Sequence, residues 1–269
     1  MLVKIKAPAK INLFLRVLGK RSDGYHNIRS GIVLINLFDE MSIKESNRTF
    51  IKYYGDFKPV SGVYSDCIIK KTLEFLNLYK RVNLEIKIKK NIPVKGGLGS
   101  ASTNAATLIK ALKQLNIIKK INKDLDYSII GADVPFFLFG KGYSLVQGIG
   151  QNITNQITSK YFFLLIKPSI SFSTKSMYQK VSKKLNKNLF IDDNDWGNDF
   201  EKIAVEKNQE IKNLLTFLQN SENCVFSRMT GTGSCCFGAF KELIYANKAQ
   251  KEINKKYPGL WSNVVNNYF

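Results

Sequence analysis

The sequence has a single histidine and only four cysteines among its 269 residues. The cysteines are Cys67, Cys224, Cys235 and Cys236, and none is paired in a Cys-x-x-Cys spacing, so no zinc site is predicted. The adjacent Cys235 and Cys236 would point to opposite faces of a strand. We therefore expect reduced thiols, as in an intracellular protein.

Long apolar runs are also missing. Lys4, Lys6 and Lys10 interrupt the N-terminal apolar residues, so no signal-peptide core is predicted there. The longest apolar runs, such as residues 161–166, are much shorter than a membrane span. We expect a cytoplasmic protein with no membrane partner, and no feature of the sequence points to a particular oligomeric state.

Acidic residues are scarce, with 21 Asp and Glu against 41 Lys and Arg, which gives a net charge of +20. Such an excess favours anionic partners, among them nucleic acids, phosphates and membrane surfaces. The lysines are scattered along the chain, however, and no block of them is interleaved with aromatic residues. We interpret most of the charge as solvated surface, and we predict no nucleic-acid partner.

Periodicity predicts an α+β fold in two domains. Strands are indicated at residues 3–7, 13–18, 31–38, 82–89, 161–166, 225–228 and 235–240. Helices are indicated at residues 65–80, 105–115, 211–218 and 243–256. Because both element types occur in both halves, we expect one domain over residues 1–155 and another over 156–269. The polar segment 151–160 is the predicted boundary.

The most informative stretch, from Pro93 to Leu115, joins a glycine-rich loop to a helix. Its glycines at 96, 97 and 99 permit positive φ angles and a close approach of backbone to ligand. A glycine loop that leads into a helix N-terminus presents unpaired N–H groups and the positive end of the helix dipole. This pattern predicts a phosphate site. A flexible turn before a capped helix is the alternative.

This loop is neither of the two commonest phosphate motifs. A P-loop requires a lysine after the glycines, and a dinucleotide fingerprint requires a glycine where Ser102 stands. Ser100, Ser102 and Thr103 follow the glycines and are natural helix N-caps. We therefore expect a nucleotide loop of another kind.

Asp133 is the strongest candidate for a general base. It lies between Ala132 and the apolar run 134–138, where a carboxylate is poorly solvated unless it is paired. An aspartate that only caps a helix or a turn explains the same pattern. Lys10, between Ala9 and Ile11, is the obvious cationic partner, although a lone lysine is usually a surface residue.

Two further segments are candidates for ligand binding. His26, the only histidine, follows Tyr25, and the pair is suited to stacking on an aromatic ligand and hydrogen bonding to it. A structural role for the histidine is the alternative. A second glycine loop at Thr230–Ser234 would cradle a second phosphate, or it is an ordinary hairpin turn.

Four segments together resemble the GHMP kinases. The central one is Pro93-x-x-Gly-Gly-Leu-Gly-Ser-Ala-Ser-Thr-Asn-Ala-Ala. The others are Pro8-Ala-Lys-Ile-Asn-Leu-Phe-Leu with Arg21-Ser-Asp-Gly-Tyr-His26, then Gly131-Ala-Asp-Val-Pro135, and Met229-Thr-Gly-Thr-Gly-Ser-Cys235. They occur in the family's order and extend nearly from end to end of the chain.

The resemblance implies a two-domain GHMP kinase fold with catalysis in the cleft between the halves. It implies ATP with Mg²⁺, no tightly bound prosthetic group, and an alcohol substrate with a cytidine diphosphate end. Asp133 matches the base that takes the proton of the substrate's 2-hydroxyl, and Lys10 matches the lysine that keeps this carboxylate ionised. No protein residue is assigned to a metal.

The resemblance also assigns the binding residues. Asn12, Tyr25 and His26 match the segment that binds the cytidine end, and Thr230 and Gly231 belong to the family's third motif and are placed with the substrate. The segment that matches the ATP phosphate loop comprises Pro93, Val94, Lys95, Gly96, Gly97, Leu98, Gly99, Ser100, Ala101, Ser102 and Thr103.

Two departures from the family pattern stand out. Ser100 and Ala101 occupy positions where family members commonly have glycine, so we expect a stiffer loop and weaker ATP binding. Cys67 stands where an asparagine near the adenine end is usual. Three rival interpretations remain at this point: another small-alcohol kinase of the family, a basic nucleic-acid-binding protein on a related scaffold, and a catalytically silent relative.

Overall fold

The computed structural model describes residues 1–59, 67–184 and 196–268. The chain forms two compact units, each assembled from separate stretches of sequence. Unit 1 comprises Met1–Ala9, Leu37–Val94 and Gly99–Gly140, and unit 2 comprises Lys10–Asn36, Lys95–Leu98 and Lys141–Phe269. The domain boundary predicted between residues 155 and 156 refers to the domains of the family and stays a prediction.

Three strands of unit 1 lie side by side in the order β3 (Phe50–Tyr54), β4 (Leu84–Lys89) and the end of β2 (His26–Glu45). β3 is parallel to β4, and β4 is antiparallel to β2. The alternation predicted at 82–89 is confirmed in β4, where Leu84, Ile86 and Ile88 are fully buried.

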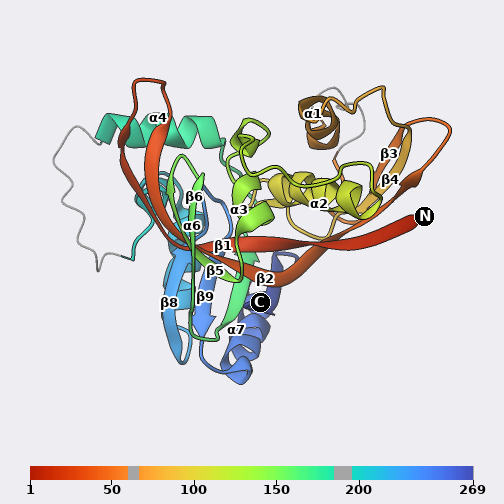
Figure 1. Cartoon of the computed structure of the whole chain (residues 1–269). Coiled ribbons are helices and arrows are strands. Elements are labelled where there is room, and N and C mark those ends of the chain that lie inside the picture. The colour runs from red at the N-terminus through yellow and green to blue at the C-terminus, as the bar shows by residue number, and fades with distance from the viewer. Residues whose placement is uncertain (60–66, 185–195, 269) are drawn as a thin grey trace. The chain divides into compact units, whose positions relative to one another are not determined.

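Two helices of unit 1, α1 (Ile68–Phe75) and α2 (Ser100–Gln114), share one apolar core with these strands (Figure 1). The predicted helix at 65–80 is too long. Asn77 and Lys80 have φ angles of 56° and 65°, which end the helical path, and residues 65 and 66 lie outside the described residues. α3 (Val134–Phe139) packs against α2, and a short 3₁₀ turn at Tyr127–Ile129 precedes it.

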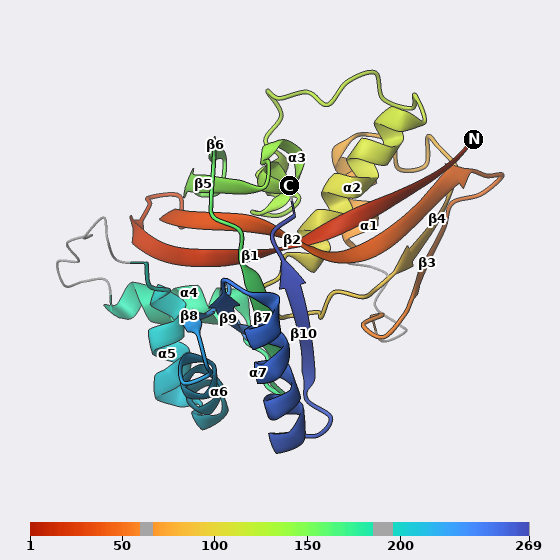
Figure 2. The ribbon, with the colours of Figure 1, turned by 90° about the horizontal axis from the view of Figure 1, so that it is seen from below.

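Unit 2 contains an antiparallel sheet in the order β10 (Trp261–Asn266), β7 (Phe162–Lys167), β9 (Cys236–Phe240) and β8 (Cys224–Met229). α6 (Gln209–Gln219) and α7 (Leu243–Lys256) bury their apolar faces in the core of this sheet. Figure 2 shows α7 alongside β7 and β10. The bounds predicted for α7 are confirmed.

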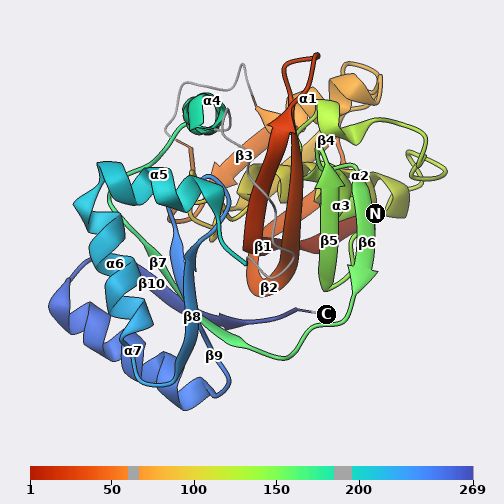
Figure 3. The same ribbon diagram turned by 90° about the vertical axis from the view of Figure 1, so that its left-hand side faces the viewer.

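Two helices of unit 2 had no clear signal in the sequence. α4 (Thr174–Lys184) is rich in lysine, and α5 (Asp199–Lys207) follows a polar segment. α5 leads directly into α6, and the two helices lie in succession in Figure 3. Phe200 and Ile203 of α5 are buried in the same core as α6.

β1 (Leu2–Lys20) and β2 are 19 and 20 residues long, and both contribute residues to each unit. The sequence predicts two short strands on either side of Pro8, but Pro8 lies within β1. Among the described strands, β1 pairs only with β2, so it is an edge strand. Proline is tolerated there because one side of an edge strand needs no N–H donors for pairing.

In unit 2, β2 also pairs with β5 (Tyr143–Gly148), and β5 pairs with β6 (Asn152–Gln156).

The four cysteines are all free. Burial raises the pKa of Cys224 to about 11 and the pKa of Cys235 to about 12, so both thiols stay protonated at neutral pH. In the described part of the chain, no helix has the length and apolarity that crossing a membrane requires.

Candidate active site

The glycine-rich stretch after β4 turns into α2 through left-handed backbone. Gly99 is the N-cap of α2 with φ 74° and ψ 17°, a conformation that costs a glycine little. The hydroxyl caps predicted at Ser100, Ser102 and Thr103 are wrong, because these residues lie inside the first turn of the helix. No side chain caps α2, so N–H groups of its first turn stay available to an anion.

One buried carboxylate, Asp39 of β2, ties both ends of this stretch together within unit 1. Before the glycines, the backbone N–H groups of Asn91 and Ile92 donate to Asp39 Oδ1 at 2.8 and 2.9 Å. After the glycines, Ser100 Oγ and Asn104 Nδ2 each donate to Asp39 Oδ2 at 3.2 Å. Asp39 therefore fixes where the loop leaves the strand and where the helix begins.

Lys90, at the end of β4, completes this buried cluster. Its ammonium is paired with Asp39 and donates to Ser100 Oγ at 2.5 Å. Burial lowers the pKa of Lys90, and the neighbouring carboxylate acts in the opposite direction. Removing one partner of such a pair leaves an uncompensated buried charge, at a cost of about 3–5 kcal/mol. Asp39, Lys90 and Asn104 were not predicted from the sequence, where the only signal is an acidic residue after the apolar run 31–38.

In unit 2 the second glycine loop, which follows β8, lies against the middle of the first. The N–H of Cys235 donates to the carbonyl of Gly96 at 3.2 Å. A Cβ atom on Gly97 would lie 2.1 Å from the carbonyl oxygen of Thr230, so only glycine permits this approach. The two loops, which the sequence presents as separate, are thus joined through their backbones.

Three of the predicted residues form a buried hydrogen-bonded group in unit 2. Lys10 Nζ donates to Asn12 Oδ1 at 2.6 Å, and Asn12 N–H donates to Thr230 Oγ1 at 3.0 Å. Asn12 Nδ2 donates to Ser30 Oγ at 2.8 Å, and that hydroxyl donates to the carbonyl of Phe14 at 2.6 Å. Lys10 is only 3% exposed, so the interpretation of Lys10 as an ordinary surface lysine is wrong.

Asn198 holds the second glycine loop in place. Its amide donates to the carbonyls of Met229 and Gly231 at 2.6 and 2.9 Å. Its side-chain oxygen accepts from the N–H of Phe200 and thereby caps α5. We did not predict Asn198 because it stands in a polar segment with no other signal of function.

Asp133 lies in unit 1 at the N-cap position of α3 and is half-buried. Its side chain makes no capping hydrogen bond, so the helix-cap interpretation does not account for it. The segment just before it approaches the first turn of α2, because a Cβ on Gly131 would lie 3.1 Å from Ser102 Oγ. Within unit 1 the candidate base is therefore on a segment adjacent to the uncapped start of α2.

Tyr25, which immediately precedes β2 in unit 2, and His26, the first residue of that strand, have different surroundings. Tyr25 is 62% exposed. His26 is half-buried, with Nε2 2.6 Å from Ser182 Oγ and its ring centroid 5.1 Å from that of Tyr178, both on α4. Burial lowers the pKa of His26, and the charge of Lys20 lowers it further. The sequence did not reveal Ser182 or Tyr178, because α4 itself was not predicted.

The predicted site residues are divided between the two units. Unit 2 holds Lys10, Asn12, Tyr25, His26, Lys95, Gly96, Gly97, Leu98, Thr230 and Gly231. Unit 1 holds Pro93, Val94, Gly99, Ser100, Ala101, Ser102, Thr103 and Asp133. Cys67, the departure near the expected adenine end, is buried in unit 1 with its Sγ 2.8 Å from Tyr53 Oη.

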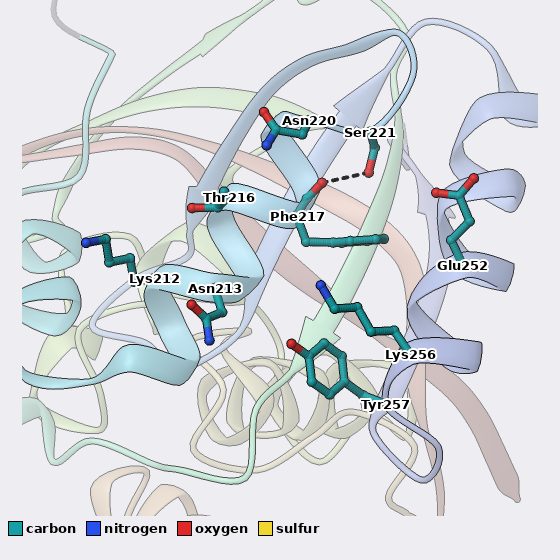
Figure 4. Close-up of a pocket in the computed structure, with 9 residues that line it drawn as sticks. All are labelled: Lys212, Asn213, Thr216, Phe217, Asn220, Ser221, Glu252, Lys256 and Tyr257. Atoms are coloured by element: carbon teal, nitrogen blue, oxygen red, sulfur yellow. Dashed lines mark hydrogen bonds between the residues drawn. The ribbon is translucent and has the colours of Figure 1, made fainter.

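No predicted site residue lines the hollow drawn in Figure 4. This hollow lies between α6 and α7 and has a volume of about 510 Å³. Its lining residues are Lys212, Asn213, Thr216, Phe217, Asn220, Ser221, Glu252, Lys256 and Tyr257.

Among the described residues, no group of three or more His, Cys, Asp or Glu side chains is arranged to hold a metal ion.

The sequence is similar to known kinases along most of its length. Residues 67–141 match the GHMP kinases N terminal domain, and residues 176–259 match the GHMP kinases C terminal domain. The 4-diphosphocytidyl-2-C-methyl-D-erythritol kinase of Francisella tularensis subsp. holarctica (strain FTNF002-00 / FTA) is 33% identical over 256 residues, which cover 92% of this chain and 90% of that protein. The kinase of the same name from Prochlorococcus marinus (strain MIT 9301) is 32% identical over 296 residues, covering 95% and 91%.

The fold is similar to solved kinase structures. A 4-(cytidine 5'-diphospho)-2C-methyl-D-erythritol kinase superposes with a TM-score of 0.76 at 22% identity, covering 98% of this chain and 99% of that one. The L. major mevalonate kinase in complex with R-mevalonate superposes with a TM-score of 0.70 at 12% identity, covering 98% and 95%. The predicted α+β fold of the GHMP kinases is thus confirmed.

Fold and matched segments together define a kinase of the GHMP type. Within that group, the chain belongs to the 4-diphosphocytidyl-2-C-methyl-D-erythritol kinase family.

Proposed function

We propose that this kinase transfers the γ-phosphoryl group of ATP to the 2-hydroxyl of 4-diphosphocytidyl-2-C-methyl-D-erythritol, in the non-mevalonate route to isoprenoid precursors. The observation that carries the proposal is the position of Asp133. Its carboxylate is not used as a helix cap, and its segment lies next to the uncapped first turn of α2. A base beside a phosphate-binding turn is the arrangement that phosphoryl transfer to an alcohol requires.

The ATP phosphates bind at the start of α2, with residues 93–103 as their loop. Backbone N–H groups at an uncapped helix start favour an anion through hydrogen bonds and through the helix dipole. The Asp39 cluster supports this by fixing both ends of the loop. The exposed Ala101 and the half-buried Ser102 lie in that same turn.

Mg²⁺ accompanies the nucleotide in this proposal. The ion usually binds phosphate oxygens and water with few protein ligands. Ser102 and Thr103 carry the hydroxyls that would hold it, and Thr103 Oγ1 is buried with no hydrogen-bond partner. When bound, the ion neutralises charge on the phosphates.

Asp133 accepts the proton of the 2-hydroxyl while that oxygen forms a bond to the γ-phosphorus and ADP leaves. No covalent intermediate with the enzyme is needed. Lys10 acts as the cation that favours the ionised form of this carboxylate. Its burial and its bond to Asn12 support a role for the charge itself.

The cytidine end of the substrate is bound by Tyr25 and His26, with Asn12, Thr230 and Gly231 on the substrate side. The 62% exposure of Tyr25 leaves its ring available for stacking. We place the enzyme in the cytoplasm, where ATP is present and where its four free cysteines stay reduced.

A substrate panel tests this function. Purified enzyme is given ATP and Mg²⁺ with 4-diphosphocytidyl-2-C-methyl-D-erythritol, its uridine analogue, mevalonate, homoserine or galactose, and ADP release is followed. We expect rapid ADP release with the cytidine substrate, slower release with the uridine analogue, and background rates with the other three. Efficient phosphorylation of another alcohol with no dependence on cytidine would overturn the proposal.

A further inference from the structure

His26 is held by a hydroxyl on another element of unit 2. Its ring nitrogen Nε2 lies 2.6 Å from Ser182 Oγ, on α4, which is close enough for a strong hydrogen bond. The first question is which of these two atoms donates. A neutral imidazole has one donor nitrogen and one acceptor nitrogen, and the answer decides which is which.

A second contact of Ser182 answers the question. The Ser182 hydroxyl donates to the carbonyl oxygen of Tyr178, one helical turn earlier, at 2.9 Å. A hydroxyl has a single proton, and a carbonyl can only accept. With that proton directed to Tyr178, Ser182 Oγ is an acceptor toward the ring. His26 Nε2 therefore carries a hydrogen and donates it to Ser182.

The ring's charge follows from its surroundings. Burial lowers the pKa of His26, and the positive charge of Lys20 acts in the same direction, so the neutral ring is favoured at neutral pH. In a neutral ring whose Nε2 bears the hydrogen, Nδ1 has a free lone pair. The ring then offers a ligand an acceptor and no second donor.

We propose that Ser182 is a specificity-determining positioning residue, which selects cytosine over uracil by fixing His26 in the Nε2–H form with Nδ1 as acceptor. Cytosine has an amino group at C4, which donates, whereas uracil has a carbonyl there, which accepts. An acceptor on the enzyme pairs with the first and repels the second. This inference rests on the proposed cytidine substrate.

The alternative is that Ser182 merely packs α4 against the start of β2. A structural role would change stability but would not change which ring nitrogen carries the hydrogen. Because the chain has one histidine, this property can be read without resonance assignment. Long-range ¹H–¹⁵N spectra of protein labelled with ¹⁵N-histidine report the hydrogen on each ring nitrogen directly.

The experiment compares the wild type with three variants at about pH 8, well above the ordinary histidine pKa. Ser182→Ala removes the acceptor, Ser182→Thr retains a hydroxyl, and Ser176→Ala is a matched serine substitution on another face of α4. We expect one pure Nε2–H form in the wild type, in Ser182→Thr and in Ser176→Ala. In Ser182→Ala the two nitrogen shifts should move toward the average of both forms. A wild-type ring with hydrogen on Nδ1, or shifts unchanged in Ser182→Ala, would overturn the proposal.

Adding nucleotides to the same proteins tests whether the state of the His26 ring determines substrate specificity. CDP should move the Nδ1 resonance of the wild type and UDP should not, and Ser182→Ala should lose this difference. In turnover, Ser182→Ala should reduce the ratio of kcat/KM for the cytidine and uridine substrates by roughly tenfold, the discrimination expected of one hydrogen bond, with an unchanged KM for ATP. A fixed ring with an unchanged ratio would also overturn the role in specificity. Failure of the wild type to phosphorylate the cytidine substrate would instead refute the proposed function, while the spectra still report on Ser182.

Discussion

Lys10 shows what the surroundings of a single residue reveal about its role. Lys10 is 3% exposed, and its ammonium donates to Asn12 Oδ1. The Asn12 amide in turn donates to the Ser30 hydroxyl, which donates to the backbone carbonyl of Phe14. Burying a lysine removes water from its ammonium, which costs free energy. We therefore expect a buried lysine where its positive charge has a function. We infer that this function is to stabilise an ionised carboxylate during catalysis.

Lys10→Met should lower kcat, because it removes the positive charge that we assign to the catalytic carboxylate and keeps a side chain of similar length. Lys4→Met, a substitution at an exposed position of the same strand, is the control and should leave kcat unchanged. An unchanged kcat in a folded Lys10→Met enzyme would show that the charge of Lys10 has no role in catalysis.

Asp133→Asn should retain the fold and the affinity for ATP but lower kcat by about two to four orders of magnitude, the usual range for general-base catalysis. The structure strengthens this expectation, because the side chain makes no capping bond whose loss would unfold α3. Asp124→Asn is the same chemical change at an exposed site of unit 1 and should leave kcat and ATP affinity unchanged. Near-normal turnover by a folded Asp133→Asn enzyme would remove Asp133 from the role of base.

Tyr25→Ala should raise KM for the cytidine substrate roughly tenfold or more, since the stacking of a base on an aromatic ring contributes about 1–3 kcal/mol. KM for ATP should stay constant, because the phosphate loop is a different segment. Tyr25 is 62% exposed, so the melting temperature should hardly change. Steady-state kinetics of Tyr25→Ala and Tyr25→Phe test this. A lower melting temperature with unchanged KM would mean that the ring only packs.

Among the elements, the start of α2 departs most from what the sequence suggests. The sequence shows the glycines and the apolar face of the helix, and both are correct. It does not show that Ser100 is helical, nor that its hydroxyl turns toward Asp39 and Lys90. Those partners are 61 and 10 residues away in sequence, and local patterns carry no information on such contacts. The expectation that Ser100 stiffens a loop therefore rests on a wrong premise.

Ser100→Gly should reduce both stability and ATP affinity, in contrast to what loop flexibility alone suggests. The change removes two hydrogen bonds to a buried ion pair, and bonds to charged groups contribute about 1.5–3 kcal/mol each. Ala101→Gly introduces the same residue one position later, at an exposed site. It should lower the free energy of unfolding by about 1 kcal/mol or less. Thermal unfolding and ATP titration measure the two effects. Equal losses in both variants would mean that the Ser100 hydroxyl contributes nothing.

Strands and helices could be predicted from the sequence where their hydrophobic periodicity is clear. β4 alternates strictly and α7 has a clean apolar face, and both were found. β3 and β6 are short and largely exposed, and α4 is dominated by polar residues, so none of them has a signal that rises above its surroundings. Their positions are determined by pairing and packing with distant segments.

At the scale of the whole molecule, the chain passes repeatedly between the two compact units. Residues 95–98, in the middle of the glycine loop, belong to unit 2, while the stretches on either side belong to unit 1. No local change in composition marks such crossings. The motifs could be found from sequence because they are local, whereas the membership of each residue in a unit depends on long-range contacts.

The central claim is that the enzyme places a phosphate on one particular hydroxyl. The most direct test is ³¹P and ¹³C NMR of the product formed from ATP and 4-diphosphocytidyl-2-C-methyl-D-erythritol labelled with ¹³C at carbon 2. We predict one new phosphomonoester signal, equal in amount to the ADP formed, with carbon–phosphorus coupling at carbon 2. ADP release without this signal, or a phosphate on any other hydroxyl, would contradict the account.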